Sequence, residues 1–484
     1  MPADPTPVPR VLLVDPYIAR DDPMERKFVE LYPSLGVLTL AAYLRAHGVE
    51  VRVIDLTFAR DTRPVANALR AFAPHVVGVH TKTLTLERGL AVARLAHRAG
   101  AYAVAGGPDA ATRPETYLTD AFDAVALGEG EETLVELARS VAARRNPAGI
   151  PGLAVREGAR IVRGPIRPFL PSLDDLPLPA WDLIDLERYL TEWDRATGNR
   201  RMAVLTSRGC PFDCAWCSKP TFGRSFRQES VERVLEELRE LRSRYRVDYV
   251  RFCDDVFGIQ RAWLEELLDR MVAERLDLRF ECLARVDLLK PDLLGRMRRA
   301  GLERVYVGVE SGSQRMLDTM NRGTKLAQVE RAAQALRREG IRQYWFLMLG
   351  YPGETLDDIA ATLRLFRKYS PEEYSVSIAV PVPGTRFYDA VKDRLRRGGR
   401  PRRPSNGGKA LLYEAVYPEA LYRWTQARFG LEASLSKARG KIRPPVLRGI
   451  GEAADAIDRR VVTPILLGGR AEPRANTERA EATT

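Results

Sequence analysis

Long apolar runs and an apolar leader are both missing from this chain of 484 residues. No stretch of about 18 consecutive apolar residues occurs, so we expect no membrane-spanning helix and no membrane partner. The opening residues, MPADPTPVPRVLLVDP, are rich in proline and lack the apolar core of a secretory signal. With 45% hydrophobic and 29% charged residues, the composition is typical of a globular cytoplasmic protein of roughly two or three domains.

Lysine is scarce, and signatures of nucleic-acid binding are scarce with it. Only 10 of the 76 basic residues are lysine, although the formal net charge is +12. The excess is concentrated at 385–450, which holds 16 basic and 5 acidic residues. Few aromatic residues are interleaved there and no RNA-binding module is visible, so we expect no nucleic-acid partner. A solvated basic face, or a site for an anionic substrate or redox partner, fits this pattern better.

Cysteine is also rare, and the few cysteines are unevenly placed. There are 5, and none precedes Cys210. So small a number excludes a disulfide framework and is typical of a reducing compartment. Three of them, Cys210, Cys214 and Cys217, form the pattern CxxxCxxC within 207–217. Three thiolates on one loop can hold three irons of a [4Fe-4S] cluster and leave the fourth iron open for a small ligand.

Two plainer interpretations of this loop stay open. Clustered cysteines can be ordinary buried thiols, which behave as small apolar residues. A structural zinc site is the other alternative, but it needs four ligands, usually in two separated pairs. Cys253 and Cys282 lie far along the chain in expected strands, where we expect them in the core. The lack of a fourth nearby ligand favours an iron-sulfur cluster in which one iron has no protein ligand.

Residues 1–145 alternate short apolar runs with helical patterns. This alternation predicts a Rossmann-like parallel sheet with crossover helices. The expected strand ends carry glycine or short polar residues at 80–83 (HTKT), 106–108 (GGP) and 128–131 (GEGE). Ligands of open α/β sheets bind at the carboxyl ends of the strands, and glycine lets backbone approach a ligand closely. We therefore expect a large ligand at this edge.

The remaining chain divides into three further regions. Residues 146–200 predict a hairpin and a proline-rich linker. Residues 201–383 contain six strand-helix units, which predicts a partial (β/α)6 barrel of the TIM type. The cysteine loop follows the first of these strands, at the carboxyl-terminal mouth where barrel active sites lie. Residues 384–484 predict a small basic helical extension with a disordered tail beyond about 470.

CxxxCxxC after the first strand of a six-unit barrel resembles the radical S-adenosylmethionine (SAM) superfamily. The later strand ends carry sequences similar to its recurring elements, at 254–257 (DDVF), 284–287 (ARVD), 308–313 (GVESGS), 349–355 (LGYPGET) and 381–385 (PVPGT). The N-terminal part resembles the cobalamin-binding domain that precedes this barrel in one large subclass, on 33–36 (PSLG), 77–79 (VGV), 106–108 with 114–115 (PE), and 128–131. The resemblance covers residues 10–385.

The resemblance implies a set of site residues in the barrel. Cys210, Cys214 and Cys217 would ligate a [4Fe-4S] cluster whose open iron binds the amino and carboxylate groups of SAM. An electron from a reductant such as flavodoxin or ferredoxin would split SAM and yield a 5′-deoxyadenosyl radical. The implied SAM-binding residues are Trp216 at the adenine, Asp254 at the amino group, Arg285 at the carboxylate, and Glu310 and Ser311 at the ribose. Core packing of Trp216, and loop capping or surface ion pairs for the others, are the alternatives.

The same resemblance implies a cobalamin site in the N-terminal sheet. The implied residues are Thr81, Thr83, Gly106, Gly107, Gly128 and Glu129. Many cobalamin proteins present DxHxxG after the first strand, and residues 15–17 (DPY) lack that histidine. Cobalamin would then bind without a protein histidine on cobalt, as in many methyltransferases of this subclass. Asp109 stands where the family often has histidine, and His80 ends a strand that is not the one expected for a cobalt ligand.

The interpretation with most support is a cobalamin-dependent radical SAM methyltransferase. Its substrate would be an unactivated carbon of a small secondary metabolite, as in antibiotic biosynthesis. The alternative is a non-methylating radical SAM enzyme, a diol dehydratase, epimerase or cyclase whose N-terminal domain does not use cobalamin. A metal- or redox-sensing protein would never cleave SAM. A methylthio-transferring tRNA enzyme would need a cysteine trio before Cys210, which the chain lacks.

Overall fold

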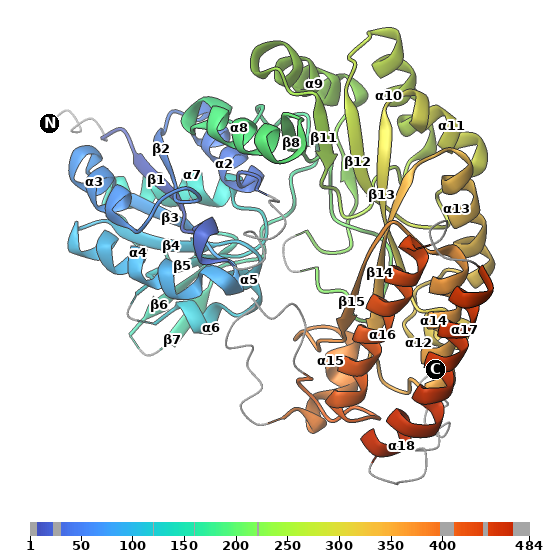
Figure 1. The fold of residues 1–484 in the computed structure, drawn as a ribbon. Helices are drawn as coiled ribbons and strands as arrows, with labels where there is room; N and C mark the ends of the chain where they lie inside the picture. The colour runs from blue at the N-terminus through green and yellow to red at the C-terminus, as the bar shows by residue number, and fades with distance from the viewer. Residues whose placement is uncertain are drawn as a thin grey trace, which may run out of the picture. The chain divides into compact units, whose positions relative to one another are not determined.

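The computed structural model describes residues 7–22, 31–119, 121–158, 160–219, 222–396, 411–438 and 444–467. The chain forms two compact units (Figure 1). Unit 1 comprises Met1–Pro211 and Lys219–Phe280, and unit 2 comprises Phe212–Ser218 and Glu281–Thr484. This division differs from the domain boundaries expected at 145, 200 and 383, which stay a prediction. The cysteine loop therefore begins in unit 1 and ends in unit 2.

A seven-stranded sheet forms the N-terminal part of unit 1, in the order β2-β1-β3-β4-β5-β6-β7 (Figure 1). Its strands are β1 (Arg10–Asp15), β2 (Glu50–Asp55), β3 (Val76–His80), β4 (Tyr102–Gly106), β5 (Ala124–Ala126), β6 (Leu153–Glu157) and β7 (Arg160–Arg163). The first five strands pair in parallel, as the strand-helix alternation predicts. β6 and β7 form an antiparallel hairpin that extends the same sheet at one edge.

Helices cover both faces of this sheet, so its strands are apolar on both sides. The helices are α2 (Leu35–Ala46), α3 (Arg63–Phe72), α4 (Leu86–Arg98), α5 (Pro108–Thr112), α6 (Pro114–Tyr117) and α7 (Glu131–Ala142). Leu12 and Val14 of β1 pack in one core with α3 and α4. Val11 and Leu13 point to the opposite face of the sheet and pack in a second core with α2 and α7. Parallel strands buried on both faces explain why β1 reads as a continuous apolar run.

Six further strands form a second sheet in the order β15-β14-β13-β12-β11-β8. They are β8 (Arg201–Val204), β11 (Tyr249–Phe252), β12 (Arg279–Ala284), β13 (Leu302–Glu310), β14 (Arg342–Leu349) and β15 (Glu373–Ile378). The recorded pairs β8–β11, β13–β14 and β14–β15 are parallel. β8 and β11 belong to unit 1, β13 to β15 belong to unit 2, and the boundary falls within β12. The six strands confirm the expected α/β partial barrel.

Helices alternate with these strands, and shorter elements surround them. The barrel helices are α9 (Val231–Tyr245), α10 (Arg261–Ala273), α11 (Pro291–Arg299), α12 (Gln314–Thr319), α13 (Leu326–Arg338) and α14 (Leu356–Tyr369). Two-residue strands β9 (Ser207–Arg208) and β10 (Arg227–Gln228) pair antiparallel beside the cysteine loop. α8 (Leu186–Thr197) lies in the region expected to be a linker. Asp185 caps its first turn and Gly198 ends it in a left-handed conformation.

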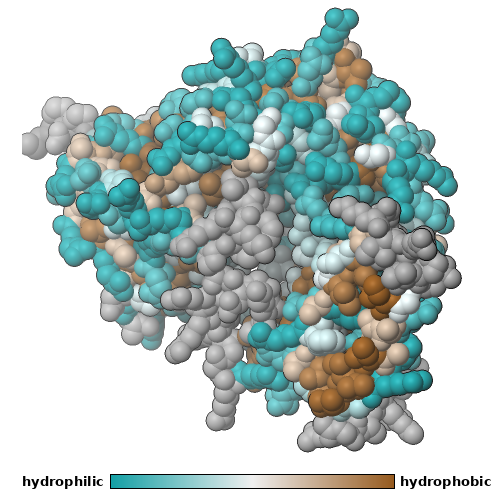
Figure 2. Space-filling view, in the orientation of Figure 1, coloured by the Kyte–Doolittle hydropathy of each residue, from teal (hydrophilic) through white to brown (hydrophobic). Residues whose placement is uncertain are grey.

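The C-terminal extension is helical where it is described. It contains α15 (Arg386–Val391), α16 (Glu419–Lys437), α17 (Pro444–Ile457) and α18 (Thr463–Leu466). Figure 2 shows apolar residues gathered over the C-terminal helices of unit 2, where Ile450, Ile457 and Ile465 are exposed. Residues 397–410 and the tail from 468, where a basic break and disorder were expected, lie outside the described residues. Among the helices of the described segments, none has the length and apolarity needed to cross a bilayer.

One expectation about the two remaining cysteines is wrong. Cys282 is buried within β12, as expected, but Cys253 is exposed. The reason is that successive side chains of extended backbone alternate between two sides: Phe252 at the end of β11 and Asp254 are buried, and Cys253 between them is exposed.

Candidate functional site

The cysteine loop follows β9 and begins with a glycine in a left-handed conformation. Gly209 has a φ of +84°, and a Cβ at this position would overlap the carbonyl oxygen of Ser225. Glycine is therefore required in the turn that leads into Cys210. Lys219 donates from Nζ to the carbonyl oxygen of Cys210 at 2.7 Å, which anchors the start of the loop.

The other two cysteines of the loop lie in unit 2, where backbone hydrogen bonds hold them. The amide of Cys217 donates to the carbonyl of Cys214 at 3.2 Å, and the amide of Ala215 donates to the carbonyl of Met320 at 2.9 Å. All three thiols of the loop are free of disulfides. Within the described ranges, no three His, Cys, Asp or Glu side chains are grouped as ligands of one metal ion. Cluster ligands bind different irons and so lie further apart, and ligation by the three cysteines stays a prediction.

Arg322 is a cation beside the cysteine loop that the sequence analysis missed. Its Nη1 donates to Sγ of Cys214 at 3.4 Å, and its Nη2 donates to the carbonyl of Gly308 at 3.1 Å. A Cβ at Gly308 would lie 2.6 Å from Nη2, so glycine makes room for the guanidinium. Burial lowers the pKa of Arg322, but Glu310 and the Cys214 thiol raise it more, so the pKa lies above its usual value. The partners are 108 residues apart, so no local sequence pattern could have joined them.

Asp254 is the second residue past β11, in unit 1, and its side chain is buried. Only one of its two carboxylate oxygens is hydrogen-bonded. Its Oδ1 accepts from the amide of Thr206 at 3.1 Å, from the Thr206 hydroxyl at 2.9 Å and from the Ser207 hydroxyl. Its Oδ2 is buried and has no hydrogen-bond partner in the part of the chain that the structure describes. Burial raises the pKa of Asp254 to about 6, although the bonds from Ser207 and Thr206 act in the opposite direction. The free oxygen can accept a hydrogen bond from an ammonium group.

Arg285 directly follows β12, in unit 2, and its guanidinium is held in a fixed orientation. Its Nε and Nη2 donate to the carboxylate of Asp287 at 3.0 and 3.2 Å, and Nη2 also donates to the carbonyl of Arg322 at 3.0 Å. The guanidinium lies 3.7 Å from the ring centre of Phe212. Its Nη1 is buried without a partner among the described residues. One donor therefore remains for a carboxylate ligand.

The other implied SAM residues differ in how many of their polar groups already have hydrogen bonds or charged neighbours within the protein. Glu310 ends β13 with a φ of +62°, an uncommon backbone conformation outside glycine. Burial raises the pKa of Glu310 to about 7, against the effect of Arg322. Ser311 is hydrogen-bonded to the hydroxyl of Thr362 at 3.2 Å, so it also stabilises its loop. Trp216 is half-buried, with the Arg322 guanidinium 5.9 Å from its ring centre.

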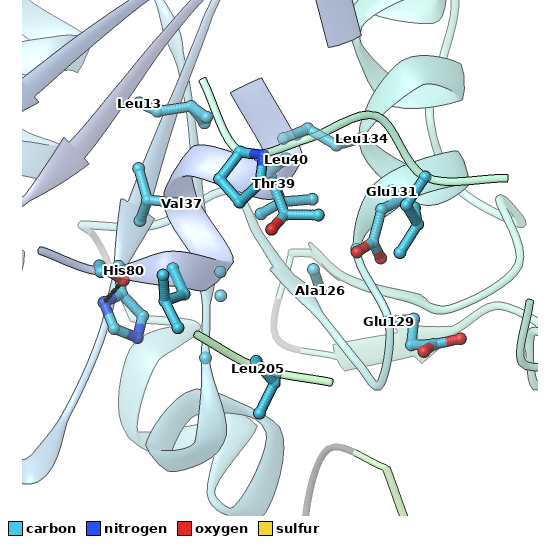
Figure 3. Close-up of a pocket in the computed structure, with 18 of the residues that line it drawn as sticks. Leu13, Val37, Thr39, Leu40, His80, Ala126, Glu129, Glu131, Leu134 and Leu205 are labelled. Atoms are coloured by element: carbon cyan, nitrogen blue, oxygen red, sulfur yellow. Dashed lines mark hydrogen bonds between the residues drawn. The ribbon is translucent and has the colours of Figure 1, made fainter. Parts of the chain in front are cut away.

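A cavity of about 390 Å³ lies at the carboxyl ends of β1, β3, β4 and β5 in unit 1 (Figure 3). Apolar side chains from several elements line it, among them Leu13, Val37, Leu40, Ala126, Leu134 and Leu205. Four of the implied cobalamin residues also line it, namely Gly106, Gly107, Gly128 and Glu129. A Cβ at Gly78 would lie 2.7 Å from Cδ2 of Leu13, so a side chain there would narrow the space. Size and apolar lining are typical of a small-molecule or cofactor site.

The two implied threonines do not line this cavity. Thr81 is buried and donates to the carbonyl of Gly106 at 2.9 Å, and Thr83 donates to Asp109 at 2.6 Å. Their hydroxyls therefore hold the strand ends together. His80 does line the cavity, and its Nδ1 is 3.1 Å from the hydroxyl of Ser34 (Figure 3).

Glu129 faces the cavity but already has cationic partners. Its carboxylate accepts from Arg208 at 2.8 Å and from Arg227 at 2.9 Å, and it also accepts from the amide of Leu170 at 2.8 Å. Glu131 pairs with the second nitrogen of Arg208 at 2.6 Å. Three members of this buried network, Glu129, Glu131 and Arg208, line the cavity.

Three further charged residues line the cavity, and the sequence did not predict them as site residues. Glu229, Arg233 and Glu237 line the cavity, on or just before α9. Charged residues spaced by four on a helix are typical of a solvated face, and that pattern hides their burial.

Comparison with known proteins gives two family matches. The radical SAM superfamily model matches residues 204–366, and the B12 binding domain model matches residues 25–138. The chain is 31% identical over 399 residues to the uncharacterized methyltransferase PH0819 of Pyrococcus horikoshii, covering 80% of this chain and 84% of that protein.

A second relative and a solved structure extend the comparison. The anaerobic magnesium-protoporphyrin IX monomethyl ester cyclase of Rubrivivax gelatinosus is 27% identical over 379 residues, which is 75% of this chain and 67% of that protein. The structure of the cobalamin-dependent S-adenosylmethionine radical enzyme OxsB, with aqua-cobalamin and S-adenosylmethionine bound, matches with a TM-score of 0.74. The match covers 96% of this chain and 74% of that one, at 17% identity, and shows a common fold.

Proposed function

We propose that this chain is a cobalamin-dependent methyltransferase, because it belongs to the radical SAM superfamily and also contains a B12 binding domain. Its substrate would be a small molecule, methylated at an unactivated carbon. The observation that carries the proposal is the cavity of unit 1 with glycines in its lining, in a chain whose CxxxCxxC cysteines form no disulfide.

The residues present fit the three cofactors of this family. The cysteine loop offers three thiols free of disulfides. Asp254 and Arg285 each keep one buried polar atom without a protein partner in the described segments, which matches the ammonium and carboxylate of SAM. Gly106, Gly107 and Gly128 line a cavity that side chains at these positions would reduce. When bound, the [4Fe-4S] cluster and SAM supply a 5′-deoxyadenosyl radical, and cobalamin supplies a methyl group.

The chain's own residues would bind and orient these groups. Cys210, Cys214 and Cys217 would hold the cluster, and Arg322 would stabilise the negative charge on Cys214 by its hydrogen bond. Asp254 is ionised above about pH 6 and would accept from the SAM amino group, since burial raises its pKa to about 6. Nη1 of Arg285 would donate to the SAM carboxylate, because Asp287 fixes the rest of the guanidinium.

The remaining implied roles belong to the same proposal. Glu310 and Ser311 would contact the ribose, and Trp216 the adenine. Thr81 and Thr83 would act on the cobalamin site indirectly, through Gly106 and Asp109. A small reductant such as flavodoxin or ferredoxin would deliver the electron, and thiolate ligation favours a reducing cytoplasmic setting.

A second candidate function is radical chemistry without methyl transfer. The relative from Rubrivivax gelatinosus is named a cyclase, and it matches 75% of this chain. In that case the N-terminal cavity would remain, but product formation would not depend on cobalamin.

One experiment separates the two functions. The protein is purified without oxygen, its cluster is rebuilt, and it is incubated with isotopically labelled SAM, reductant and candidate small molecules, with and without cobalamin. Methyl transfer predicts 5′-deoxyadenosine, S-adenosylhomocysteine and a labelled methyl group in the product, all dependent on cobalamin. If 5′-deoxyadenosine forms equally without cobalamin and no label enters the product, the methyltransferase proposal is wrong.

A further inference from the structure

The α9 side of the unit 1 cavity carries three charged side chains, each with one buried polar atom that has no partner among the described residues. Glu229, Arg233 and Glu237 are spaced by four residues, so the two on α9 share one helix face with the residue that precedes the helix. Glu237 is 3% exposed, and its Oε1 is buried with no hydrogen-bond partner in the described chain. Oε2 of Glu229 and Nε of Arg233 are buried without partners within the same ranges. All three residues line a space that is otherwise mostly apolar.

Arg233 does not neutralise the two carboxyl groups. Its Nη1 is paired with Glu236 at 3.0 Å, and its Nη2 donates to the carbonyl of Leu176 at 2.7 Å. A buried carboxylate without a paired cation is strongly destabilising, and two neighbouring carboxylates cannot both ionise cheaply. Burial without a paired cation therefore favours the protonated form of both carboxyl groups, and a protonated carboxyl group has a hydroxyl that can donate.

The electrostatic surroundings agree with this protonation state. Burial raises the pKa of Glu237 well above its usual value, Glu229 and Glu240 raise it further, and Arg233 opposes them. Burial also raises the pKa of Glu229 to about 7. The charged groups facing Glu229 from other elements are Asp174, Asp254 and Arg208, and Arg208 is itself paired with Glu129 and Glu131.

We propose that Glu237, with Glu229 beside it, helps to bind the corrinoid in the cavity, by donating a hydrogen bond from a neutral carboxyl group to a neutral acceptor on that ligand. Cobalamin offers two such acceptors, the amide carbonyls of its corrin rim and the ring nitrogen of its nucleotide base. A cationic ligand fits less well, because Arg233 lies on the same wall. The inference rests on the proposed function, since it takes cobalamin as the occupant.

The test compares cobalamin binding by purified variants, measured by equilibrium dialysis and by the absorbance of the bound corrinoid, without turnover. Glu237→Leu removes the donor and should weaken binding about tenfold, as for a lost buried hydrogen bond. Glu237→Gln keeps a neutral donor and should bind within about threefold of the unsubstituted protein. Glu232→Gln is the matched control, because Glu232 lies on the same helix and pairs with Arg239 and Arg270 outside the cavity.

The pH dependence supplies a second readout. The unsubstituted protein should lose affinity as the pH rises through about 7, where Glu229 ionises, and lose more at higher pH as Glu237 ionises, because ionised carboxyl groups no longer donate. Glu237→Gln should lose less affinity over the same range. The melting temperature of each variant shows whether it folds. If Glu237→Leu has a lowered melting temperature, the pH dependence of Glu237→Gln still tests the proposal.

The source of the acceptor is assigned with cobinamide, which keeps the amides but lacks the nucleotide base. Equal weakening of both ligands by Glu237→Leu assigns the amides, and weakening of cobalamin alone assigns the base. The proposal is overturned if Glu237→Leu binds both ligands normally, or if Glu237→Gln binds as poorly as Glu237→Leu, which would show that charge is needed. If the unsubstituted protein binds no corrinoid, the proposed function fails first, and this inference fails with it.

Discussion

Arg322→Gln should lower the midpoint potential of the cluster held by the cysteine loop. Arg322 is 9% exposed, and its Nη1 donates to Sγ of Cys214 at 3.4 Å. Reduction adds one negative charge to a cluster, so a buried cation bonded to a ligand sulfur stabilises the reduced state more than the oxidised state. Removing that cation therefore makes reduction harder.

The magnitude follows from the geometry. A hydrogen bond to a charged group contributes about 1.5–3 kcal/mol, and only the part that differs between the two redox states changes the potential. If about half of the bond energy differs, the change is about 0.8–1.5 kcal/mol. At 59 mV per tenfold for one electron, this corresponds to about 35–65 mV. A second effect has the same sign, because Arg322 also raises the local positive potential through its full charge.

The assay is a redox titration of the rebuilt cluster, followed by electron paramagnetic resonance. Arg322→Lys keeps the charge and should shift the potential by less than half as much as Arg322→Gln. Arg331→Gln on α13 makes the same charge change at an exposed position and should leave the potential unchanged. A potential for Arg322→Gln within about 15 mV of the unsubstituted protein would show that the bond to Cys214 does not act on the cluster.

Three further predictions follow from the same sites. Cys210→Ala should abolish the iron content of the rebuilt protein, whereas Cys253→Ala, which changes an exposed cysteine outside the loop, should keep it; equal iron in both would refute cluster binding by the loop. Gly107→Ala should lower the melting temperature and weaken cobalamin binding, because Gly107 has a φ of +103° and its Cβ would lie 2.8 Å from His80. Gly106→Ala, with nothing within 4 Å of its Cβ, should keep the fold, and an equal loss of stability would contradict this. SAM affinity, measured by calorimetry, should fall as the pH drops through about 6, because the raised pKa of Asp254 leaves it neutral below that value; a flat profile that matches Asp254→Asn would refute the role of its carboxylate.

The sheets and their strand ends could be predicted from the sequence because their signals are local. Strands such as β1 are buried on both faces and read as continuous apolar runs. Gly106 ends β4, Gly107 follows it, and Gly128 lies two residues past β5, and parallel strands place their carboxyl ends at one edge. The structure places all three on the same cavity, although their contact with a cofactor stays a prediction.

The sequence could not show which polar groups are already paired. Glu129 sits among those glycines, but Arg208 and Arg227, about eighty and a hundred positions away, already occupy its carboxylate. Arg322 reaches Cys214 only because the chain between them folds through the barrel strands. Glu237 resembles a solvated helix residue until the cavity beside α9 is known. Each of these depends on a tertiary contact that spacing along the chain does not encode.

Buried carboxyl groups gather where strands end, and this placement links the fold to its ligands. Asp254 follows β11, Glu310 ends β13 and Glu354 follows β14, and burial raises their pKa values to about 6, 7 and 8. Between about pH 4 and those values the folded chain binds protons that the unfolded chain has released, so each group lowers stability as the pH rises through that window. A ligand that brings a cation or a hydrogen-bonding group to these strand ends offsets that cost. Asp254, Glu354 and Glu237 each keep one buried carboxyl oxygen without a partner among the described residues, so we expect a bound ligand to supply the missing hydrogen bonds at Asp254 and Glu237.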